Sequence, residues 1–347
     1  MISLAVKYRP QTFEEVTGQE SIRIILQQQL KSGEVKHAYL FCGGAGTGKT
    51  TCARIFAKEI NKGQGNPIEM DAASNSGVED VRNIIQQAKS KSLDSEYKVF
   101  IVDECHAISL MGWQAFLKML EEPPAKSIFI FCTTDPQKIP KTILSRVQRY
   151  DFQRISQDGI VERLEHIINE EWKEHPDWDA ECDRDAIEYL AKIADGGMRD
   201  AITLMDKALS YAKDLTLENV VKALGTTNYD TMFQLTDSFV YPDSARMMTI
   251  IDNIHAQGKD LKRFIKTYIQ FLLDVNKYAL GCDWSQLSLP RLGEYEKRMD
   301  KWLKDNDIFT SLLNSIVKID NDIKYSSSPK YDIEARMLLW IEGGDLE

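Results

Sequence analysis

The chain of 347 residues lacks several features that would place it in other protein classes. No apolar run approaches the ~20 residues that a membrane-spanning helix needs. The first residues do not show the basic-then-apolar layout of a signal peptide, and there are neither internal repeats nor a low-complexity tail. The six cysteines include no C-x-x-C pair, which argues against a disulfide framework and a cysteine zinc site. We therefore expect a soluble, cytoplasmic protein with reduced thiols and no membrane partner.

The chain is acidic, with a formal net charge of -10. An acidic chain does not fit a general nucleic-acid coat protein. DNA binding through a local basic surface, or as one member of a larger assembly, stays open. With 43% hydrophobic residues, the chain is long enough for two or three domains with their own cores.

Residues 43–50 fit the phosphate-loop pattern G-x-x-x-x-G-K-[ST] without a mismatch. An apolar run at residues 38–42 predicts a strand before the loop, and residues 51–58 predict a helix after it. In this setting Lys49 would reach the β- and γ-phosphates, and the Thr50 hydroxyl would ligate Mg²⁺. A glycine-rich turn that binds nothing is the alternative. The predicted nucleotide-binding residues of this segment are Gly43, Gly44, Ala45, Gly46, Thr47, Gly48, Lys49, Thr50 and Thr51.

Strand and helix patterns alternate in the first part of the chain. Buried strands are predicted at residues 67–71, 97–102 and 127–132. A capping box at residues 76–79 predicts a helix start, and a second helix over residues 109–122 carries Leu110, Trp113, Leu117 and Leu120 at helical spacing. Nearly continuous apolar strands are typical of a parallel sheet covered on both faces. The predicted fold class is α/β, a doubly wound domain with ligands at the strand carboxyl ends.

The strand signal fades from about residue 156. Helices are predicted at residues 159–172, 184–193 and 198–212, which indicates a small helical domain. Beyond residue 226 the pattern stays helical to the end, with apolar stripes that we interpret as ordinary core. Examples of these stripe residues are Ile265, Ile269, Leu272, Leu273, Ala335, Leu338, Leu339 and Ile341.

Two acids, Asp103 and Glu104, follow the predicted strand at residues 97–102. Many strands end in acids at a solvated edge, so this pattern alone is weak. After a complete phosphate loop, however, such a strand supplies the second half of the site. Asp103 would hold Mg²⁺, directly or through water, and Glu104 would act as general base toward the attacking water.

Further motifs are shared with one family. They lie at residues 7–13, 18–20, 103–106, 120–124, 133–138, 143–146 and 197–201. Together they resemble the gamma/tau subunits of the bacterial DNA polymerase III clamp loader, which belong to the AAA+ superfamily. The resemblance is dense up to about residue 225 and is mainly helical pattern beyond it.

The resemblance implies roles for single residues. Thr134 matches the sensor 1 position near the γ-phosphate, and Arg199 matches sensor 2 on the lid. Arg146 matches the arginine finger that acts in trans on a neighbouring subunit's ATP. The alternative for either arginine is a surface salt bridge. The adenine side of the site would be formed by Tyr8, Arg9 and Pro10. The implied catalytic set is Lys49, Glu104, Thr134, Arg146 (in trans) and Arg199.

The chain departs from the family pattern in two places. Val147 stands where the family usually has cysteine after the finger arginine. The cysteine-rich zinc module of the family is replaced by residues 61–66, which contain no cysteine, so we predict no zinc site. We also expect the chain to lack the long extension of the tau form, as a compact phage or mobile-element homologue would, and cellular or phage origin stays open.

The resemblance implies an AAA+ ATPase of three parts: a nucleotide domain at residues 1–155, an all-α lid at 156–225 and an all-α collar at 226–347. Its cofactors would be ATP and Mg²⁺. It would assemble with other clamp-loader subunits into an open ring, expected to be a pentamer. This ring would open a sliding clamp on primer-template DNA, and DNA and clamp would stimulate hydrolysis. The alternatives are a non-hydrolysing scaffold subunit of the same ring and a branch-migration or helicase-type AAA+ motor.

Overall fold

The computed structural model describes residues 2–90, 92, 94–176, 181–224, 228–305 and 308–343. The chain divides into two compact units, one built from Met1–Asp179 and Leu190–Asp206 and the other from Ala180–Tyr189 and Lys207–Glu347. The three-part division stays a prediction, and its boundary at residues 225 and 226 lies outside the described residues.

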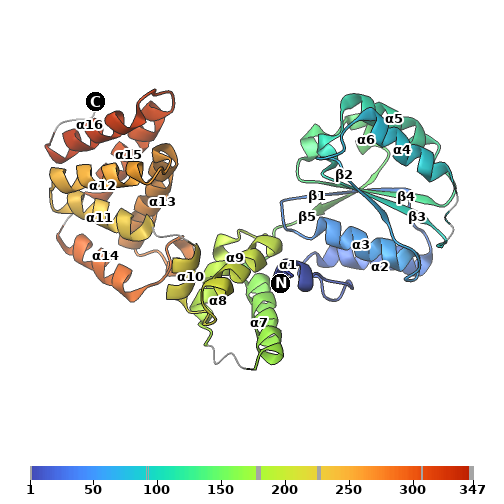
Figure 1. Ribbon diagram of the computed structural model, residues 1–347, viewed down its shortest axis with the longest axis horizontal. Coiled ribbons are helices and arrows are strands. Elements are labelled where there is room, and N and C mark those ends of the chain that lie inside the picture. The colour runs from blue at the N-terminus through green and yellow to red at the C-terminus, as the bar shows by residue number, and fades with distance from the viewer. Residues whose placement is uncertain are drawn as a thin grey trace. The chain divides into compact units, whose positions relative to one another are not determined.

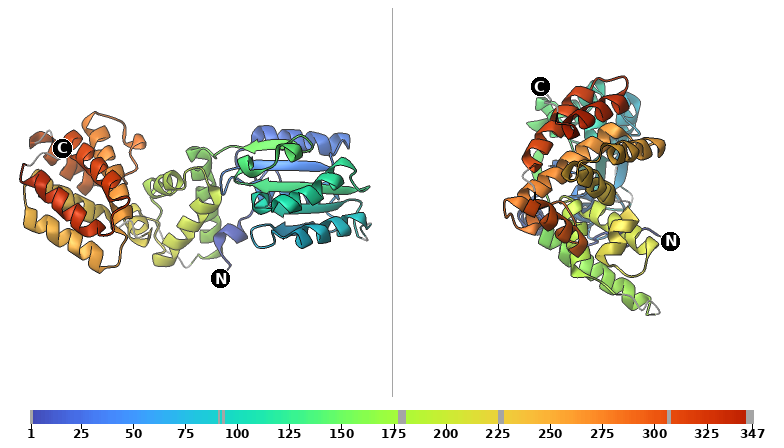
Figure 2. Two further views of the ribbon diagram at one scale, coloured as in Figure 1. Left: turned by 90° about the horizontal axis from the view of Figure 1, so that it is seen from above. Right: turned by 90° about the vertical axis from the view of Figure 1, so that its left-hand side faces the viewer.

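A five-stranded parallel sheet forms the centre of the first unit (Figure 1 and Figure 2). Its spatial order is β2-β3-β4-β1-β5, so β1 lies between β4 and β5. The carboxyl ends of parallel strands share one edge, where doubly wound sheets bind their ligands. This arrangement confirms the predicted α/β class. The strands are β1 (Ala38–Gly43), β2 (Ile68–Asp71), β3 (Lys98–Asp103), β4 (Ser127–Thr133) and β5 (Gln148–Phe152).

Helices cover both faces of this sheet (Figure 1). Side chains of α4, α5 and α6 pack with the residues of one face, and those of α2 and α3 pack with the residues of the other. These helices are α2 (Glu20–Ser32), α3 (Lys49–Ile60), α4 (Val78–Lys89), α5 (Leu110–Glu121) and α6 (Lys141–Leu144).

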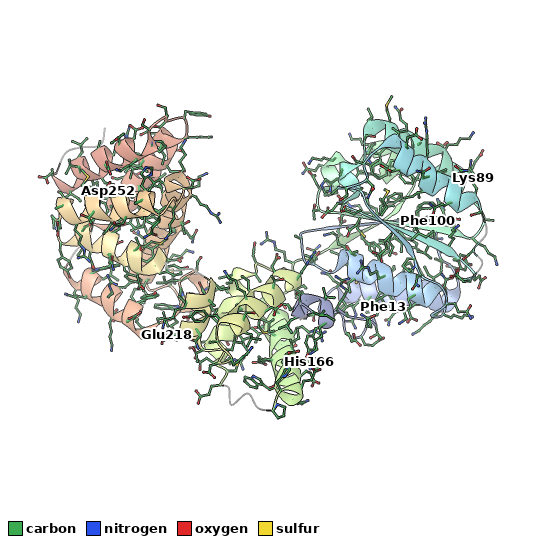
Figure 3. All side chains as sticks on the ribbon, in the orientation of Figure 1. Phe13, Lys89, Phe100, His166, Glu218 and Asp252 are labelled. Atoms are coloured by element: carbon green, nitrogen blue, oxygen red, sulfur yellow. The ribbon has the colours of Figure 1, made fainter. Side chains whose placement is uncertain are left out.

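Alternation along the strands explains this double cover. Leu40 points into the layer beneath α4 and α5, whereas Tyr39 and Phe41 point into the layer beneath α2 and α3. Phe100, labelled in Figure 3, is fully buried and stacks on Phe129 with ring centroids 4.8 Å apart. Burial on both faces accounts for the nearly continuous apolar strands of the sequence.

The start of α4 differs from the predicted capping box by one residue. The N-cap is Gly77 instead of Ser76, and the carboxylate of Asp80 accepts a hydrogen bond from the Gly77 N–H at 3.2 Å. Glycine has no side chain, so only the returning half of the box is formed. In α5, Leu110 belongs to the predicted apolar stripe but is 68% exposed.

The remaining elements are mostly helical. Short 3₁₀ turns occur at Cys105–Ala107, Pro136–Lys138 and Trp284–Gln286. The α-helices are α1 (Leu4–Lys7), α7 (Gln157–Glu174), α8 (Arg184–Ile193), α9 (Met198–Tyr211), α10 (Leu217–Leu224), α11 (Asn228–Val240), α12 (Ser244–Ala256), α13 (Leu261–Ala279), α14 (Gly293–Asp305), α15 (Phe309–Ile323) and α16 (Pro329–Ile341).

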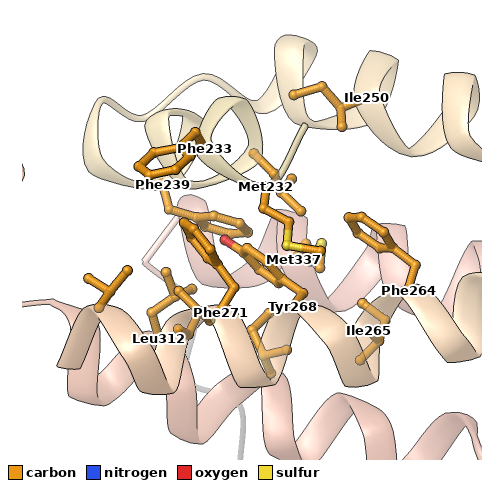
Figure 4. Close-up of a cluster of buried hydrophobic side chains, with 14 of the residues drawn as sticks. Met232, Phe233, Phe239, Ile250, Phe264, Ile265, Tyr268, Phe271, Leu312 and Met337 are labelled. Atoms are coloured by element: carbon orange, nitrogen blue, oxygen red, sulfur yellow. The ribbon is translucent and has the colours of Figure 1, made fainter. Parts of the chain in front are cut away.

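The second unit has its own hydrophobic core between the helices from α11 to α16 (Figure 4). Tyr268 lies fully buried in it, and its hydroxyl pairs with the Thr236 hydroxyl at 2.9 Å. The prediction that the apolar helical stripes form core is confirmed for Ile265 and Leu272, which are buried. Leu273 and Leu339 are exposed instead. The all-α character predicted for this region is therefore confirmed.

Within the described ranges, no helix combines the length and apolarity needed to cross a bilayer. The same residues contain no group of three or more His, Cys, Asp or Glu arranged to hold a metal ion, and the lack of zinc stays a prediction. The six cysteines form no disulfide, and four of them are buried in the first unit.

We expect these four thiols to resist modification in the native protein. Burial raises the pKa of Cys42 to about 11 and that of Cys52 to about 12, and it raises the pKa of Cys105 and Cys132 as well. The thiolate is the reactive form, so these groups stay inert near neutral pH. Titration with a colorimetric disulfide reagent should therefore give only two rapidly reacting thiols.

The rapid pair should be Cys182 and Cys282, which are half-buried. A double variant with both residues changed to serine should lose the rapid phase and keep the slow one. More than two rapid thiols in the native wild-type protein would contradict the expected burial.

Candidate nucleotide-binding site

A cavity of about 360 Å³ lies where the phosphate loop follows β1, entirely within the first unit. The loop, the N-terminal segment, the end of β3 and the helices α7 and α9 contribute to its wall. The predicted site residues that line it are Tyr8, Arg9, Pro10, Gly46, Thr47, Gly48, Lys49, Thr50, Thr51, Asp103 and Arg199. The lining residues that sequence reasoning missed are Ala5, Val16, Thr17, Arg54, Ile155, Arg163, Met198 and Ile202.

The loop requires glycine where it passes the start of α9. Gly46 has a φ of +68°, and a Cβ atom there would come within 3.0 Å of the Cα atom of Gly197. The carbonyl of Gly46 also accepts a hydrogen bond from the N–H of Met198 at 3.0 Å. The loop and the first turn of α9 therefore meet backbone to backbone. The predicted residues Gly43, Gly44 and Ala45 precede this point and are outside the described cavity lining.

Lys49 is the cation at the base of the loop. Its side chain is almost fully buried, and its Nζ donates to the carbonyls of Gly43 at 2.9 Å and Gly44 at 2.7 Å. Burial lowers the pKa of Lys49, while Cys132, Glu104 and Asp103 act in the opposite direction. Two neutral carbonyls thus satisfy an ammonium that could bind an anion much more strongly.

Thr50 and Asp103 meet at the opening of α3. The Thr50 hydroxyl donates to a carboxylate oxygen of Asp103 at 2.8 Å. Both are hard oxygen ligands beside the phosphate loop, and Mg²⁺ takes few protein ligands of this kind. The residues present therefore fit the predicted Mg²⁺ site.

Glu104 lies beside this pair in an uncommon backbone conformation, with φ of +45°. Its N–H donates to Asp103 at 3.0 Å. One carboxylate oxygen of Glu104 accepts from the Thr134 hydroxyl at 3.1 Å and lies 3.2 Å from Nδ1 of His106. The ends of β3 and β4 thus bring the predicted general base and the predicted sensor together. His106 is a neighbour that sequence reasoning did not assign to the site.

The two predicted arginines are placed differently. Arg199 lines the cavity from the first turn of α9, and its guanidinium has no hydrogen-bond or ion-pair partner among the described residues. Arg146 lies outside the cavity lining. Its guanidinium donates to Glu121 at 2.7 Å, to the Thr142 carbonyl at 2.7 Å and to the Ser145 hydroxyl at 3.0 Å.

A phosphate loop after a central strand of a parallel sheet, with Arg199 from a later helix lining the same cavity, is the arrangement of the AAA+ class of proteins. Residues 66–156 match the family "DNA polymerase III, delta subunit", and residues 159–214 match "DNA polymerase III clamp loader subunit, ATPase lid domain".

The chain is 33% identical over 291 residues to DNA polymerase III subunit gamma of Buchnera aphidicola subsp. Schizaphis graminum, covering 78% of each chain. It is 34% identical over 355 residues to DNA polymerase III subunit tau of Bacillus subtilis, covering 95% of this chain and 62% of that protein. The chain thus spans less than two thirds of the Bacillus subtilis relative. The chain therefore belongs to the DNA polymerase III gamma/tau family of clamp-loader subunits. This family membership and the AAA+ fold imply nucleotide binding.

Solved structures agree on the fold. The Thermotoga maritima RuvB Holliday junction branch migration motor aligns with a TM-score of 0.51 at 20% identity. The alignment covers 73% of this chain and 86% of that chain. At this level of identity the similarity concerns the fold alone.

Proposed function

We propose that this chain binds and hydrolyses ATP with Mg²⁺, as the motor subunit of a sliding-clamp loader in DNA replication in the cytoplasm. One observation carries the proposal. The buried cation of the phosphate loop, the Thr50–Asp103 pair and the Glu104–Thr134 pair follow neighbouring strands of one sheet edge. Family membership supplies the biological setting.

Each residue has a role in the proposed reaction. Lys49 exchanges its two carbonyl partners for phosphate oxygens, and the loop N–H groups bind the same anion. Thr50 and Asp103 would hold Mg²⁺, which would neutralise phosphate charge. Glu104 takes a proton from the attacking water, and Thr134 orients that carboxylate toward the γ-phosphate. Arg199 from its own chain and Arg146 in trans stabilise the charge that develops in the transition state.

In its assembly the chain would form an open, pentameric ring with other clamp-loader subunits. Residues 1–155 would bind nucleotide, residues 156–225 would form the lid, and residues 226–347 would form the collar. ATP binding would favour the conformation that opens the clamp, and primer-template DNA would trigger hydrolysis and clamp release. ATP, clamp and DNA would then raise one another's affinity because they favour one conformation.

The rate of ATP hydrolysis, titrated with primer-template DNA in the presence and absence of sliding clamp, tests this proposal. We expect DNA and clamp together to raise the rate above that with either alone. A non-hydrolysing scaffold subunit would show no turnover under any of these conditions. A branch-migration motor would respond to a four-way DNA junction instead of primer-template DNA.

Nucleotide binding itself is tested by Lys49→Ala. The change removes an ammonium that can make charge-assisted bonds to two phosphates, so we expect ATP affinity to fall by about 100-fold or more. Calorimetric titration with ATP in the presence of Mg²⁺ measures the effect. Lys58→Ala, an exposed change on the same helix α3, is the matched control and should leave affinity unchanged. Equal affinity of the Lys49→Ala and Lys58→Ala proteins would contradict the assignment of the loop.

A further inference from the structure

We infer that Glu171 is a positioning residue for the base of the nucleotide, because it fixes the N-terminal segment at residues 7–10 against the cavity. The inference rests on the proposed nucleotide site and adds a determinant far from the phosphate loop in sequence. The ligand class is the base moiety of a nucleoside triphosphate. Glu171 itself is not among the described cavity-lining residues, so its effect is exerted through the segment.

The contacts of Glu171 hold two successive side chains of the segment. Glu171 lies on α7 and is 5% exposed. One of its carboxylate oxygens accepts from Nζ of Lys7 at 2.5 Å and from the Tyr8 hydroxyl at 2.7 Å. A second residue of α7, Arg163, donates from its guanidinium to the Tyr8 carbonyl at 2.9 Å. The helix thus fixes the segment by both side chains and backbone.

The charges make this attachment strong. Burial alone would raise the pKa of Glu171, but the hydrogen bonds from Lys7 and Tyr8 outweigh it and lower that pKa. Burial, followed by the contact with Glu171, raises the pKa of Tyr8 to about 12. The acceptor therefore stays ionised and its donors stay protonated near neutral pH. A buried carboxylate is costly without partners, so docking of the segment and burial of Glu171 depend on each other.

The segment itself forms part of the cavity wall. Tyr8, Arg9 and Pro10 line the cavity, together with the apolar side chains of Val16 and Ile155. These groups offer planar and apolar surface, which suits a heterocyclic base, whereas the loop N–H groups and Lys49 suit the phosphates. Because α7 fixes the segment, binding of the base depends on Glu171 while binding of the phosphates does not.

Glu171→Gln separates these two parts of binding. The amide keeps the size of the side chain but removes the charge, which weakens two charge-assisted hydrogen bonds. We expect the affinity for ATP to fall by about tenfold. The affinity for inorganic tripolyphosphate, which has no base, should stay unchanged. The measured quantity is the ratio of the dissociation constant for ATP to that for tripolyphosphate, which should rise in the variant. Both constants are determined by calorimetric titration of the full chain with Mg²⁺.

Two further variants make the test decisive. Glu170→Gln removes a charge from the preceding residue of α7, whose carboxylate pairs with Lys173, and should keep the wild-type ratio. Lys7 lies outside the cavity lining, and Lys7→Met removes one donor to Glu171 together with the ion pair to Glu174. This variant should raise the ratio as Glu171→Gln does. The thermal unfolding midpoint shows whether the Glu171→Gln protein is folded. If it is not, the ratio measured for Lys7→Met tests the inference.

A wild-type ratio in folded Glu171→Gln and Lys7→Met proteins would overturn the inference. So would an equal loss of affinity for ATP and tripolyphosphate, because that outcome marks general damage to the site. A wild-type chain that binds tripolyphosphate as tightly as ATP would also overturn it. If the wild-type chain binds neither ligand, the proposed nucleotide site fails, and the inference fails with it.

Discussion

Glu104→Gln should lower the steady-state rate of ATP hydrolysis by about 10³-fold, within the range that general-base catalysis contributes. The amide cannot accept the proton of the attacking water. The dissociation constant for ATP should stay at its wild-type value, because Lys49 and the loop are untouched. Phosphate release and calorimetric ATP binding measure the two quantities on the same preparation.

The geometry makes this substitution clean. A glutamine oxygen can still accept the hydrogen bond from Thr134, so the end of β4 keeps its contact with residue 104. Glu79→Gln is the matched control, because Glu79 is exposed on α4 and pairs with Arg82. An undiminished rate in the Glu104→Gln protein would remove the role of general base from this residue.

Arg146→Ala should lower hydrolysis in the assembled ring by about 10³-fold or more, the effect of an arginine finger supplied in trans. ATP binding by the variant chain should be nearly intact, because Arg146 does not line the cavity of its own chain. Phosphate release by the ring and ATP titration of the isolated chain measure these two effects.

In the structure, Arg146 is bound to Glu121 of its own chain, and both side chains are partly exposed. Exposed ion pairs contribute about 0–1 kcal/mol, so exchange of Glu121 for a phosphate on a neighbouring subunit costs little. The intramolecular contact is therefore compatible with a function in trans.

Mixed rings provide the decisive test of Arg146. A Glu104→Gln chain has an inactive site and an intact finger, whereas an Arg146→Ala chain has an intact site and no finger. Hydrolysis should return wherever the first chain sits beside the second. Arg149→Ala, a nearby arginine paired with Asp151, is the control and should not lower the rate. If mixed rings form but their activity never exceeds the sum of the separate variants, Arg146 is a structural residue of its own unit.

Local patterns were sufficient to predict much of the α/β fold. The strands with continuous apolar runs, such as residues 127–132, are buried on both faces and were found within one residue of their observed ends. β5 was missed because it is only half apolar. In its sequence Tyr150 and Phe152 are buried, while Arg149 and Asp151 are exposed, so this short run lacks the continuous apolar stretch by which the other strands were predicted.

The site residues also differ in whether the sequence around them is enough to predict their role. The phosphate loop and Asp103 are recognisable because each lies in a short segment whose own residues show the relevant chemistry. Arg163 and Glu171 were missed because charged residues in an amphipathic helix usually face solvent. Their partners Lys7 and Tyr8 lie more than 150 residues away in the sequence. Pairing at that distance leaves no periodic signal in a single chain.

The left-handed backbone at Glu104 has a consequence for protein engineering. A residue other than glycine held in such a conformation stores about 1–3 kcal/mol of strain. Glycine or asparagine would adopt it more readily, so substitutions that relax this turn should make the fold more stable while removing the carboxylate. Any attempt to raise the melting temperature through consensus or library selection should therefore hold position 104 fixed. At this residue thermostability and turnover are in direct trade-off.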